Sequence, residues 1–470
     1  MITATFLHDP DFIRAAYIVA FSLFIVGLMQ LRGPRTAVRG NAIAAVGMAI
    51  AIGATLLIDG MGNWGLIALG VAIGTAIGVP AARNVKMTAI PQMVALFNGV
   101  GGGAVALIAW VEFRATDGYA HDPLYIVIAS LFGAIVGSVS FWGSNIAFGK
   151  LQEIVPGRPI TLGRAQQVVN LTLLLAAIGL SVAIATGEDS ELLIIGVLVA
   201  AALLGNFVVL PIGGADMPVV ISLLNAFTGL SAAAAGIALN NTAMIVAGML
   251  VGASGSILTK LMADAMNRSI PHIVAGGFGG VTVASGAGPD LEGKTVKSTT
   301  AADAAIELSY AHQVVIVPGY GMAVAQAQHA VRALAKELEA RGIDVKYAIH
   351  PVAGRMPGHM NVLLAEANVP YEQLKEMDEI NPEFARTDVS LVIGANDVTN
   401  PAANTNPDSP IYGMPILNVN ESQSVIVIKR SMNPGFAGID NELYYDERTQ
   451  MLFGDAKSAV GEITEEVKAL

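Results

Sequence analysis

Nine apolar stretches occupy most of residues 12–266, and they limit the fold of this chain more than any other feature. Each stretch is close to the ~20 residues that a helix needs to cross ~30 Å of hydrocarbon. Because backbone groups in lipid must bond to one another, we expect each stretch to be a transmembrane helix. The predicted spans are 12–31, 41–58, 64–82, 91–111, 124–148, 165–186, 191–212, 218–239 and 242–262.

Positive charges are distributed unevenly over the predicted loops. The loops after the first, third, fifth and ninth spans hold ten lysines and arginines, whereas the opposite side holds two. Such an excess marks cytoplasmic loops, so we expect the N-terminus outside and the C-terminal region in the cytoplasm. The N-terminal segment also lacks the positive charge of a signal peptide. The ten residues are Arg32, Arg35, Arg39, Arg83, Lys86, Lys150, Arg158, Arg164, Lys260 and Arg268.

The residues after the spans have the composition of a soluble domain. Residues 1–270 hold 12 basic and 12 acidic residues, whereas 271–470 hold 14 and 25 and carry the whole net charge of −11. An acidic surface argues against nucleic-acid binding, and the lack of cysteine excludes disulfides and thiol catalysis. We expect a membrane domain over 1–270, a glycine-rich hinge over 271–293 and an α/β domain over 294–470, with no metal site.

Polar side chains within the spans are the functional candidates of the membrane half, since a polar group in lipid is costly unless it is paired. Asn98, Asn206 and Asn225 lie within predicted spans, and Asp216 lies between the seventh and the eighth. Each asparagine can serve either in an interhelical hydrogen bond or in a proton path. Glycines spaced four residues apart predict close helix packing at Gly70, Gly74 and Gly78, at Gly133 and Gly137, and at Gly248 and Gly252.

The sequence GPDLEGKT at 288–295 matches the phosphate-binding loop of ATPases, but we reject an ATP site there. That loop presents backbone N–H groups to phosphate and opens a helix. Here Pro289 has no N–H, and Asp290 and Glu292 would repel the anion. Thr300 and Asp303 form a capping pattern that predicts a later helix start.

A glycine turn follows the first predicted strand of the soluble half. The apolar run Gln313–Val317 predicts a buried parallel strand, and Gly319-Tyr320-Gly321 precedes a helix that we expect to reach Arg341 and stop at Gly342. Strand, Gly-x-Gly turn and helix place a dinucleotide pyrophosphate at a helix N-terminus. The alternative is a plain tight turn, and Val324 departs from the usual glycine or alanine.

Polar residues end three further predicted strands. Val345–Ile349 leads to His350, where an acid would normally hold the adenosine ribose, which indicates either a different cofactor pose or no cofactor. Val389–Ile393 leads to GAND at 394–397. Val425–Ile428 leads to Lys429 and Arg430, which suit the 2′-phosphate of NADP unless they are a solvated pair. The predicted fold is a polytopic all-α membrane domain followed by a Rossmann-like α/β domain with a mostly parallel sheet.

Several long motifs closely resemble the β subunit of the proton-translocating NAD(P) transhydrogenases. They are GYGMAVAQAQ at 319–328, HPVAGRMPGHMN at 350–361, GAND at 394–397, KRSMN at 429–433 and, in the membrane half, ADMPVV at 215–220. The resemblance covers most of the chain. It implies that the α/β domain binds NADP(H) in a flipped pose, which accounts for the missing acid.

The resemblance also implies the cofactor contacts. Phe436 departs from the family, whose members carry tyrosine at that position. The implied contacts are Gly319, Tyr320, Gly321, Met322, Val324, Ala325, His350, Val352, Ala353, Gly354, Arg355, Met356, Pro357, Gly394, Ala395, Asn396, Asp397, Val398, Gly413, Met414, Lys429, Arg430, Ser431, Met432, Asn433, Gly435, Phe436, Asp455 and Ala456.

Partners and proton path follow from the same resemblance. Asn225 matches a position tied to proton passage, and Asn98 falls where some members have histidine, which points to a titrating group on a partner membrane subunit. One dinucleotide fingerprint is too few for two cofactors, so we expect NAD(H) on one or more alpha subunits, including a separate small membrane subunit, in a dimer of the whole assembly in the bacterial inner membrane. The rival class is a transporter or channel whose soluble domain senses a nucleotide.

Overall fold

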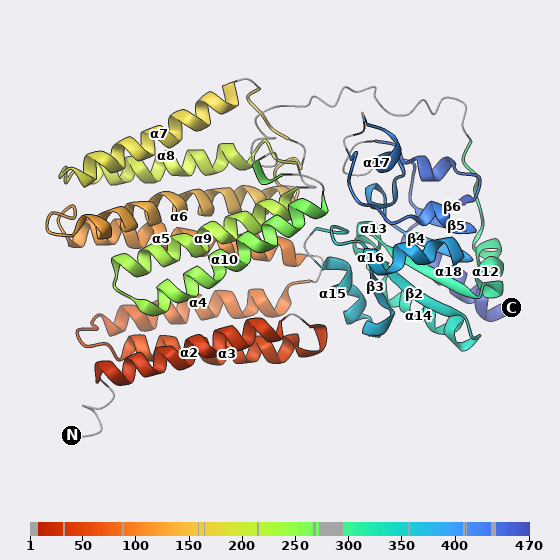
Figure 1. The fold of residues 1–470 in the computed structure, drawn as a ribbon, viewed down its shortest axis with the longest axis horizontal. Coiled ribbons are helices and arrows are strands. Elements are labelled where there is room, and N and C mark those ends of the chain that lie inside the picture. Colours follow the sequence, from red (N-terminus) through yellow and green to blue (C-terminus); the bar gives the residue numbers. More distant parts are fainter. Residues whose placement is uncertain are drawn as a thin grey trace. The chain divides into compact units, whose positions relative to one another are not determined.

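The structure is a computed structural model, and the chain forms two compact units, one of long apolar helices and one that contains a β-sheet (Figure 1). The residues that it describes are 8–31, 33–86, 89–157, 159–163, 165–213, 216–266, 269–271, 295–355, 358–407, 409, 411–433 and 439–470. The predicted hinge 271–293 and the GPDLEGKT sequence fall almost entirely outside them, as do Arg32, Arg158, Arg164 and Arg268.

Within the described residues, nine helices are long and apolar enough to cross a membrane, as the hydropathy pattern predicts. The first predicted loop is wrong in part, because α3 begins at Pro34 and includes Arg35 and Arg39. Proline suits that first position, where its missing N–H costs no helical hydrogen bond. The helices are α2 (Pro10–Gln30), α3 (Pro34–Leu56), α4 (Trp64–Asn84), α5 (Ile90–Ala115), α6 (Leu124–Leu151), α7 (Ala165–Ala185), α8 (Glu191–Val209), α9 (Met217–Ala238) and α10 (Thr242–Ala265).

Glycines bring two helix pairs into backbone contact. A Cβ atom on Gly137 of α6 would lie 2.7 Å from the carbonyl oxygen of Gly102 in α5, and one on Gly248 of α10 would lie 2.5 Å from the nitrogen of Ala233 in α9. The predicted packing role of Gly137 and Gly248 is therefore confirmed. The glycines of α4 differ, since a Cβ on Gly70 would meet no atom within 4 Å and α4 buries no residue against the described chain.

The second unit contains one six-stranded parallel sheet with the strand order β3-β2-β1-β4-β5-β6. The four predicted strands are confirmed, and β3 and β6 are additional. This order is that of a doubly wound dinucleotide-binding sheet, with its switch point between β1 and β4. The strands are β1 (Gln313–Pro318), β2 (Asp344–Ile349), β3 (Leu374–Glu376), β4 (Val389–Ile393), β5 (Ser424–Lys429) and β6 (Thr449–Phe453).

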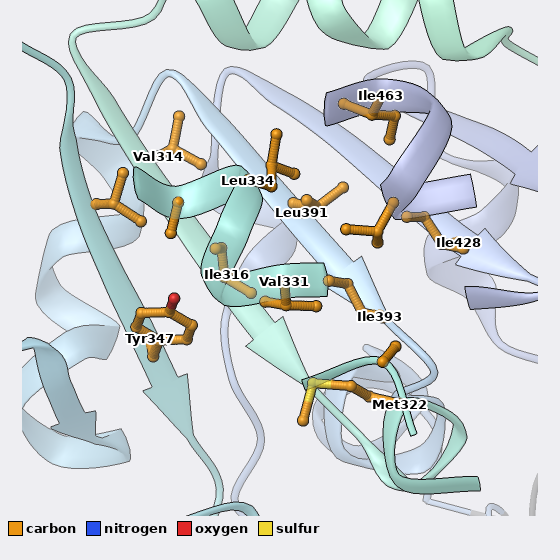
Figure 2. Packing of buried hydrophobic residues seen from close by; sticks show 14 of the residues in the cluster. Val314, Ile316, Met322, Val331, Leu334, Tyr347, Leu391, Ile393, Ile428 and Ile463 are labelled. Carbon is orange, nitrogen blue, oxygen red and sulfur yellow. The ribbon is translucent and has the colours of Figure 1, made fainter. Parts of the chain in front are cut away.

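Alternate strand residues build two apolar layers, as the two-residue period of a strand requires. Ile316 packs with Leu334 under one face, and Figure 2 shows part of this cluster. Residues of α12, α14, α15 and α18 belong to it. Val317 belongs to the opposite layer, which short elements close. The remaining helices are α12 (Ala301–Tyr310), α13 (Tyr320–Val324), α14 (Gln328–Ala340), α15 (His359–Glu366), α16 (Met377–Ile380), α17 (Ala402–Thr405) and α18 (Ala456–Ala469), and the 3₁₀ turns are η2 (Tyr371–Gln373), η3 (Asn381–Arg386), η4 (Asp397–Thr399), η5 (Val419–Glu421) and η6 (Glu442–Tyr445).

The helix predicted after the glycine turn is broken in two. The short α13 ends where Gln326 adopts φ +50°, and the N–H of Ala327 donates to the carbonyl of Met322 at 3.0 Å. This is a Schellman motif in which glutamine takes the position that glycine usually has. The sequence at the break therefore lacks the glycine or proline that usually marks the end of a helix. The predicted cap at Thr300 is confirmed, because its Oγ1 accepts from the N–H of Asp303 at 3.2 Å.

Candidate functional site

Two turns meet at the switch point of the sheet. The turn after β1 and the turn after β4 are joined by backbone hydrogen bonds from Gly319 N to Ile393 O and from Gly321 N to Gly394 O, each 2.9 Å long. A Cβ atom on Gly319 would lie 2.3 Å from Cα of Ala395. Gly394 has φ +65°, and a Cβ there would lie 2.4 Å from Cα of Gly321. These glycines are therefore required for the close approach of two backbones, whatever ligand binds.

The helix at this turn gives less support to the predicted pyrophosphate site than the sequence suggests. The α13 helix has five residues, so its N-terminus lacks the aligned dipoles of the long helix that we expected. Tyr320 is half-buried and Met322 is fully buried within α13, whereas Val324 is exposed. An anion at this place would need donors from other segments.

His350 connects the end of β2 to a distant segment. Its Nε2–H donates to the carbonyl oxygen of Pro415 at 2.8 Å, while its Nδ1 accepts from the N–H of Val352 at 3.2 Å. Burial lowers the pKa of His350 to about 4, so the ring is neutral at neutral pH. The predicted contact Val352 is thereby held by a buried side chain that also bonds to Pro415, the residue after the predicted contact Met414.

A second buried histidine, which the sequence did not single out as a site residue, organises the same loop. Nδ1 of His359 accepts from the N–H of Arg355 at 3.1 Å, and its Nε2 has no partner among the described residues. Burial, and secondarily the charge of Arg355, lowers the pKa of His359 to about 4. The Arg355 guanidinium lies 4.5 Å from the ring centroid of Tyr320, so the loop after β2 reaches the turn after β1.

The turn after β4 is held by two residues that sequence reasoning missed. Asn441 donates through Nδ2 to the backbone oxygen of Asn396 at 3.0 Å, and the hydroxyl of Tyr444 donates to Oδ1 of Asn396 at 2.7 Å. Both residues are buried, and Asn441 also caps η6 by accepting from the N–H of Leu443. The only local signal was an asparagine at a turn, a common position for that residue.

Lys429 and Arg430, the basic pair at the end of β5, lie in different environments. Lys429 is half-buried, with Nζ 4.7 Å from the ring centroid of Tyr444 and 2.6 Å from the carbonyl oxygen of Asn433. Burial lowers the pKa of Lys429, against the opposing effect of the carboxylates of Asp397 and Asp440. Arg430 is exposed. The ammonium group is thus held by two contacts, whereas the guanidinium belongs to an exposed side chain.

Other predicted contacts follow β6, bond to α17 or lie outside the described residues. Asp455 follows β6, and its carboxylate accepts from the N–H groups of Lys457 and Ser458 as the cap of α18. Gly413 donates through its N–H to the carbonyl of Ala403 at 2.8 Å. Met356, Pro357, Gly435 and Phe436 lie outside the described residues.

In the helical unit, a chain of amide and hydroxyl groups joins three helices. Nδ2 of Asn98 in α5 donates to Ser144 Oγ at 2.9 Å and to Ser140 Oγ at 3.3 Å, both in α6. Ser140 Oγ lies 2.6 Å from Thr228 Oγ1 of α9. Oδ1 of Asn98 is buried and has no partner among the described residues. These hydrogen bonds form a polar network inside three largely apolar helices.

The structure places the other polar candidates of the spans separately. Ser140 also donates to the carbonyl of Leu224, which brings the chain to the residue next to Asn225. Asn225 is half-buried, and its side chain makes no hydrogen bond with the described residues. Asn206 lies in α8, with a buried Oδ1 that lacks a described partner. Asp216 directly precedes α9 and is half-buried.

Comparison with known proteins agrees with both units. Residues 13–466 match the family described as NAD(P) transhydrogenase beta subunit. Two curated relatives from Rhodospirillum rubrum, both named NAD(P) transhydrogenase subunit beta, are each 50% identical to this chain over 459 residues. The matched region covers 96% of this chain and 98% of each relative.

Proposed function

Because the chain belongs to the family of NAD(P) transhydrogenase beta subunits, we propose that its α/β domain binds NADP(H) and exchanges hydride with NAD(H) held by an alpha subunit. The observation that carries the proposal is the half-buried Lys429 at the carboxyl edge of a parallel sheet, beside a switch point where two glycine turns meet. Ligands of open parallel sheets bind at this edge.

The side chains at this edge fit a ligand rich in hydrogen-bond acceptors. Nδ2 of Asn396 and Nε2 of His359 are buried donors without partners among the described residues. A buried donor left unpaired costs about 1–3 kcal/mol, so a ligand that pairs with it gains affinity. Lys429 and Arg430 would hold the 2′-phosphate, and the other contacts predicted from the sequence remain part of the proposal. When bound, the nicotinamide supplies the hydride chemistry, and the protein supplies position.

A titration of the full chain in detergent micelles tests the cofactor. We expect NADPH to bind more tightly than NADH, and Lys429→Ala to weaken NADPH roughly 10- to 100-fold while NADH is unchanged, because a charged hydrogen bond to phosphate is lost. Lys336→Ala, the same change at an exposed site on α14, is the matched control. Equal binding of the two nucleotides by the unmodified chain would instead favour a transporter or channel with a nucleotide sensor.

The membrane domain, which we assign to 1–270, would carry the proton. The polar chain from Asn98 through Ser140 to Thr228 reaches the turn of α9 that holds Asn225, and water bonded to the open Oδ1 of Asn98 would extend it. Asn98 and Asn225 do not titrate, so the group that changes charge belongs to another residue or to a partner membrane subunit.

The proton gradient supplies the driving force in this proposal. Hydride passes between two nicotinamides of nearly equal reducing power, whereas one proton that crosses 100 mV releases about 2.3 kcal/mol. We propose that protonation changes the affinity of the 294–470 domain for NADP(H) through the 271–293 segment and the loop of Asp216. We propose that the N-terminus lies outside and the α/β domain in the cytoplasm of a bacterium, for which the positive loops are the support. The proposal also includes a dimer of the whole assembly in the inner membrane.

A vesicle experiment tests the coupling. With the alpha subunits present, Asn225→Leu should abolish proton-linked turnover, while hydride exchange between bound nucleotides continues because the α/β domain is unchanged. Internal pH and NADPH absorbance are followed together. Full proton pumping by the variant would refute the role of Asn225, and hydride exchange without any pH change in the unmodified protein would refute the coupling.

A further inference from the structure

Tyr444 connects two parts of the proposed nucleotide site that are far apart in sequence. It lies in η6, is 2% exposed, and belongs to the apolar layer on the second face of the sheet. Its hydroxyl donates to Oδ1 of Asn396, after β4, and its ring lies 4.7 Å from the ammonium nitrogen of Lys429, at the end of β5. A single side chain therefore contacts both strand ends.

The hydroxyl of Tyr444 fixes which way the Asn396 amide faces. Oδ1 of Asn441 accepts from the N–H of Leu443, so Nδ2 is the end of the Asn441 amide that faces Asn396. Two donors, Asn441 Nδ2 at 3.2 Å and the Tyr444 hydroxyl at 2.7 Å, then converge on Oδ1 of Asn396. The amide nitrogen of Asn396 is turned away from both of them, buried and without a described partner.

The ring of Tyr444 orients Lys429. Its face attracts the ammonium group through the ring quadrupole. Among the described residues, the carbonyl of Asn433 is the hydrogen-bond acceptor of Nζ, which uses one of the three N–H bonds of the group. Two N–H bonds of the Lys429 ammonium group are thus available to a ligand at the edge of the sheet.

We infer that Tyr444 is a positioning residue with two separable roles: its hydroxyl presents the Asn396 amide to a part of the nucleotide that NADPH and NADH share, and its ring presents Lys429 to the 2′-phosphate. The inference rests on the proposed function. It requires that the two roles respond to different substitutions. Loss of the hydroxyl alone weakens both nucleotides equally, and loss of the ring also reduces the preference for NADPH.

Nucleotide affinities of full-chain variants test this separation. Tyr444→Phe keeps the ring, so we expect both dissociation constants to rise about tenfold with their ratio unchanged. Tyr444→Leu removes the ring as well, so the NADPH preference should fall about fivefold further. Tyr445→Phe is the matched control, since this neighbouring hydroxyl makes no hydrogen bond with the described residues, and its affinities should stay as they are.

A series of substitutions that preserve the size of the side chain controls for loss of folding. If Tyr444→Leu does not fold, phenylalanine with increasing fluorination at position 444 keeps the shape and weakens the ring quadrupole, and the NADPH preference should fall stepwise while NADH affinity stays constant. A ratio that does not respond to fluorination, or that changes equally in Tyr444→Phe, overturns the inference. Lack of NADPH preference in the unmodified chain would instead be a failure of the proposed function.

Discussion

The two units of this protein place their polar groups by opposite rules. In the helical unit, Asn98, Ser140 and Thr228 lie in the middle of apolar helices and are bonded to one another. In the α/β unit, β4 and β5 are mostly apolar, and Asn396 and Lys429 stand where these strands end. An unpaired polar group in lipid is costly, whereas a strand end lies at the edge of a parallel sheet, where ligands bind. The difference is consistent with the proposed proton path in the first unit and the proposed binding edge in the second.

Glycines let two backbones come into contact in both units, but the consequences of substituting them differ. Gly102 and Gly137 let two regular helices approach, so a larger side chain can be accommodated by a small separation of the helices. Gly319 and Gly394 interlock two turns that are joined by hydrogen bonds to the sheet, where no such movement is available. Substitution should therefore cost more in the α/β unit.

The largest effect is expected at the interlocked turns. Gly319→Ala places a Cβ atom 2.3 Å from Cα of Ala395, so the free energy of unfolding of the α/β unit should fall by more than about 4 kcal/mol. Gly461→Ala, in the interior of α18 with nothing within 4 Å, should instead stabilise by about 0.5–1 kcal/mol. Denaturant unfolding in detergent measures both, and equal effects would contradict the interlocking.

Acid should destabilise the α/β unit next most strongly. The folded-state pKa of His350 is about 4 against an unfolded value of about 6.5, so between these pH values the unfolded chain binds a proton that the folded protein does not. The contribution of His350 to stability is complete above pH 6.5 and falls by up to about 3 kcal/mol as the pH drops to 4. Thermal unfolding against pH should show this slope reduced in His350→Gln and retained in His312→Gln, an exposed control. An unchanged slope in the first variant would rule out His350 as its source.

The smallest effect is expected at the helix contact. Gly137→Ala places a Cβ atom 2.7 Å from Gly102 O, and partial separation of α5 and α6 should limit the loss to about 1–3 kcal/mol. Gly70→Ala on α4 is the matched control, and it should leave the stability of the isolated chain unchanged or slightly higher. The comparison between the units would fail if Gly137→Ala were as damaging as Gly319→Ala.

Local pattern was enough to predict the long apolar helices and four of the six strands of the described residues. Hydropathy over ~20 residues marks every membrane helix, and short apolar runs mark β1, β2, β4 and β5. Parallel strands bring their carboxyl ends to one edge, so the turns that follow them are predicted to meet as soon as the strands are recognised. Periodicity and turn residues act over a few positions, which is why a sequence displays them directly.

The contacts that orient the site were decided only in the folded protein. Tyr444 and Asn396 are 48 positions apart in the sequence. His359 is a polar residue that is buried, and its residue type does not predict that burial. The break at Gln326 carries no glycine or proline. The strand β3 has only three residues, and β6 begins with two polar residues, so neither shows a clear apolar run. Chain direction and packing of the whole sheet set these distances. The sequence alone therefore determined which segments converge, and the tertiary structure determined which side chains hold them and which donors remain open.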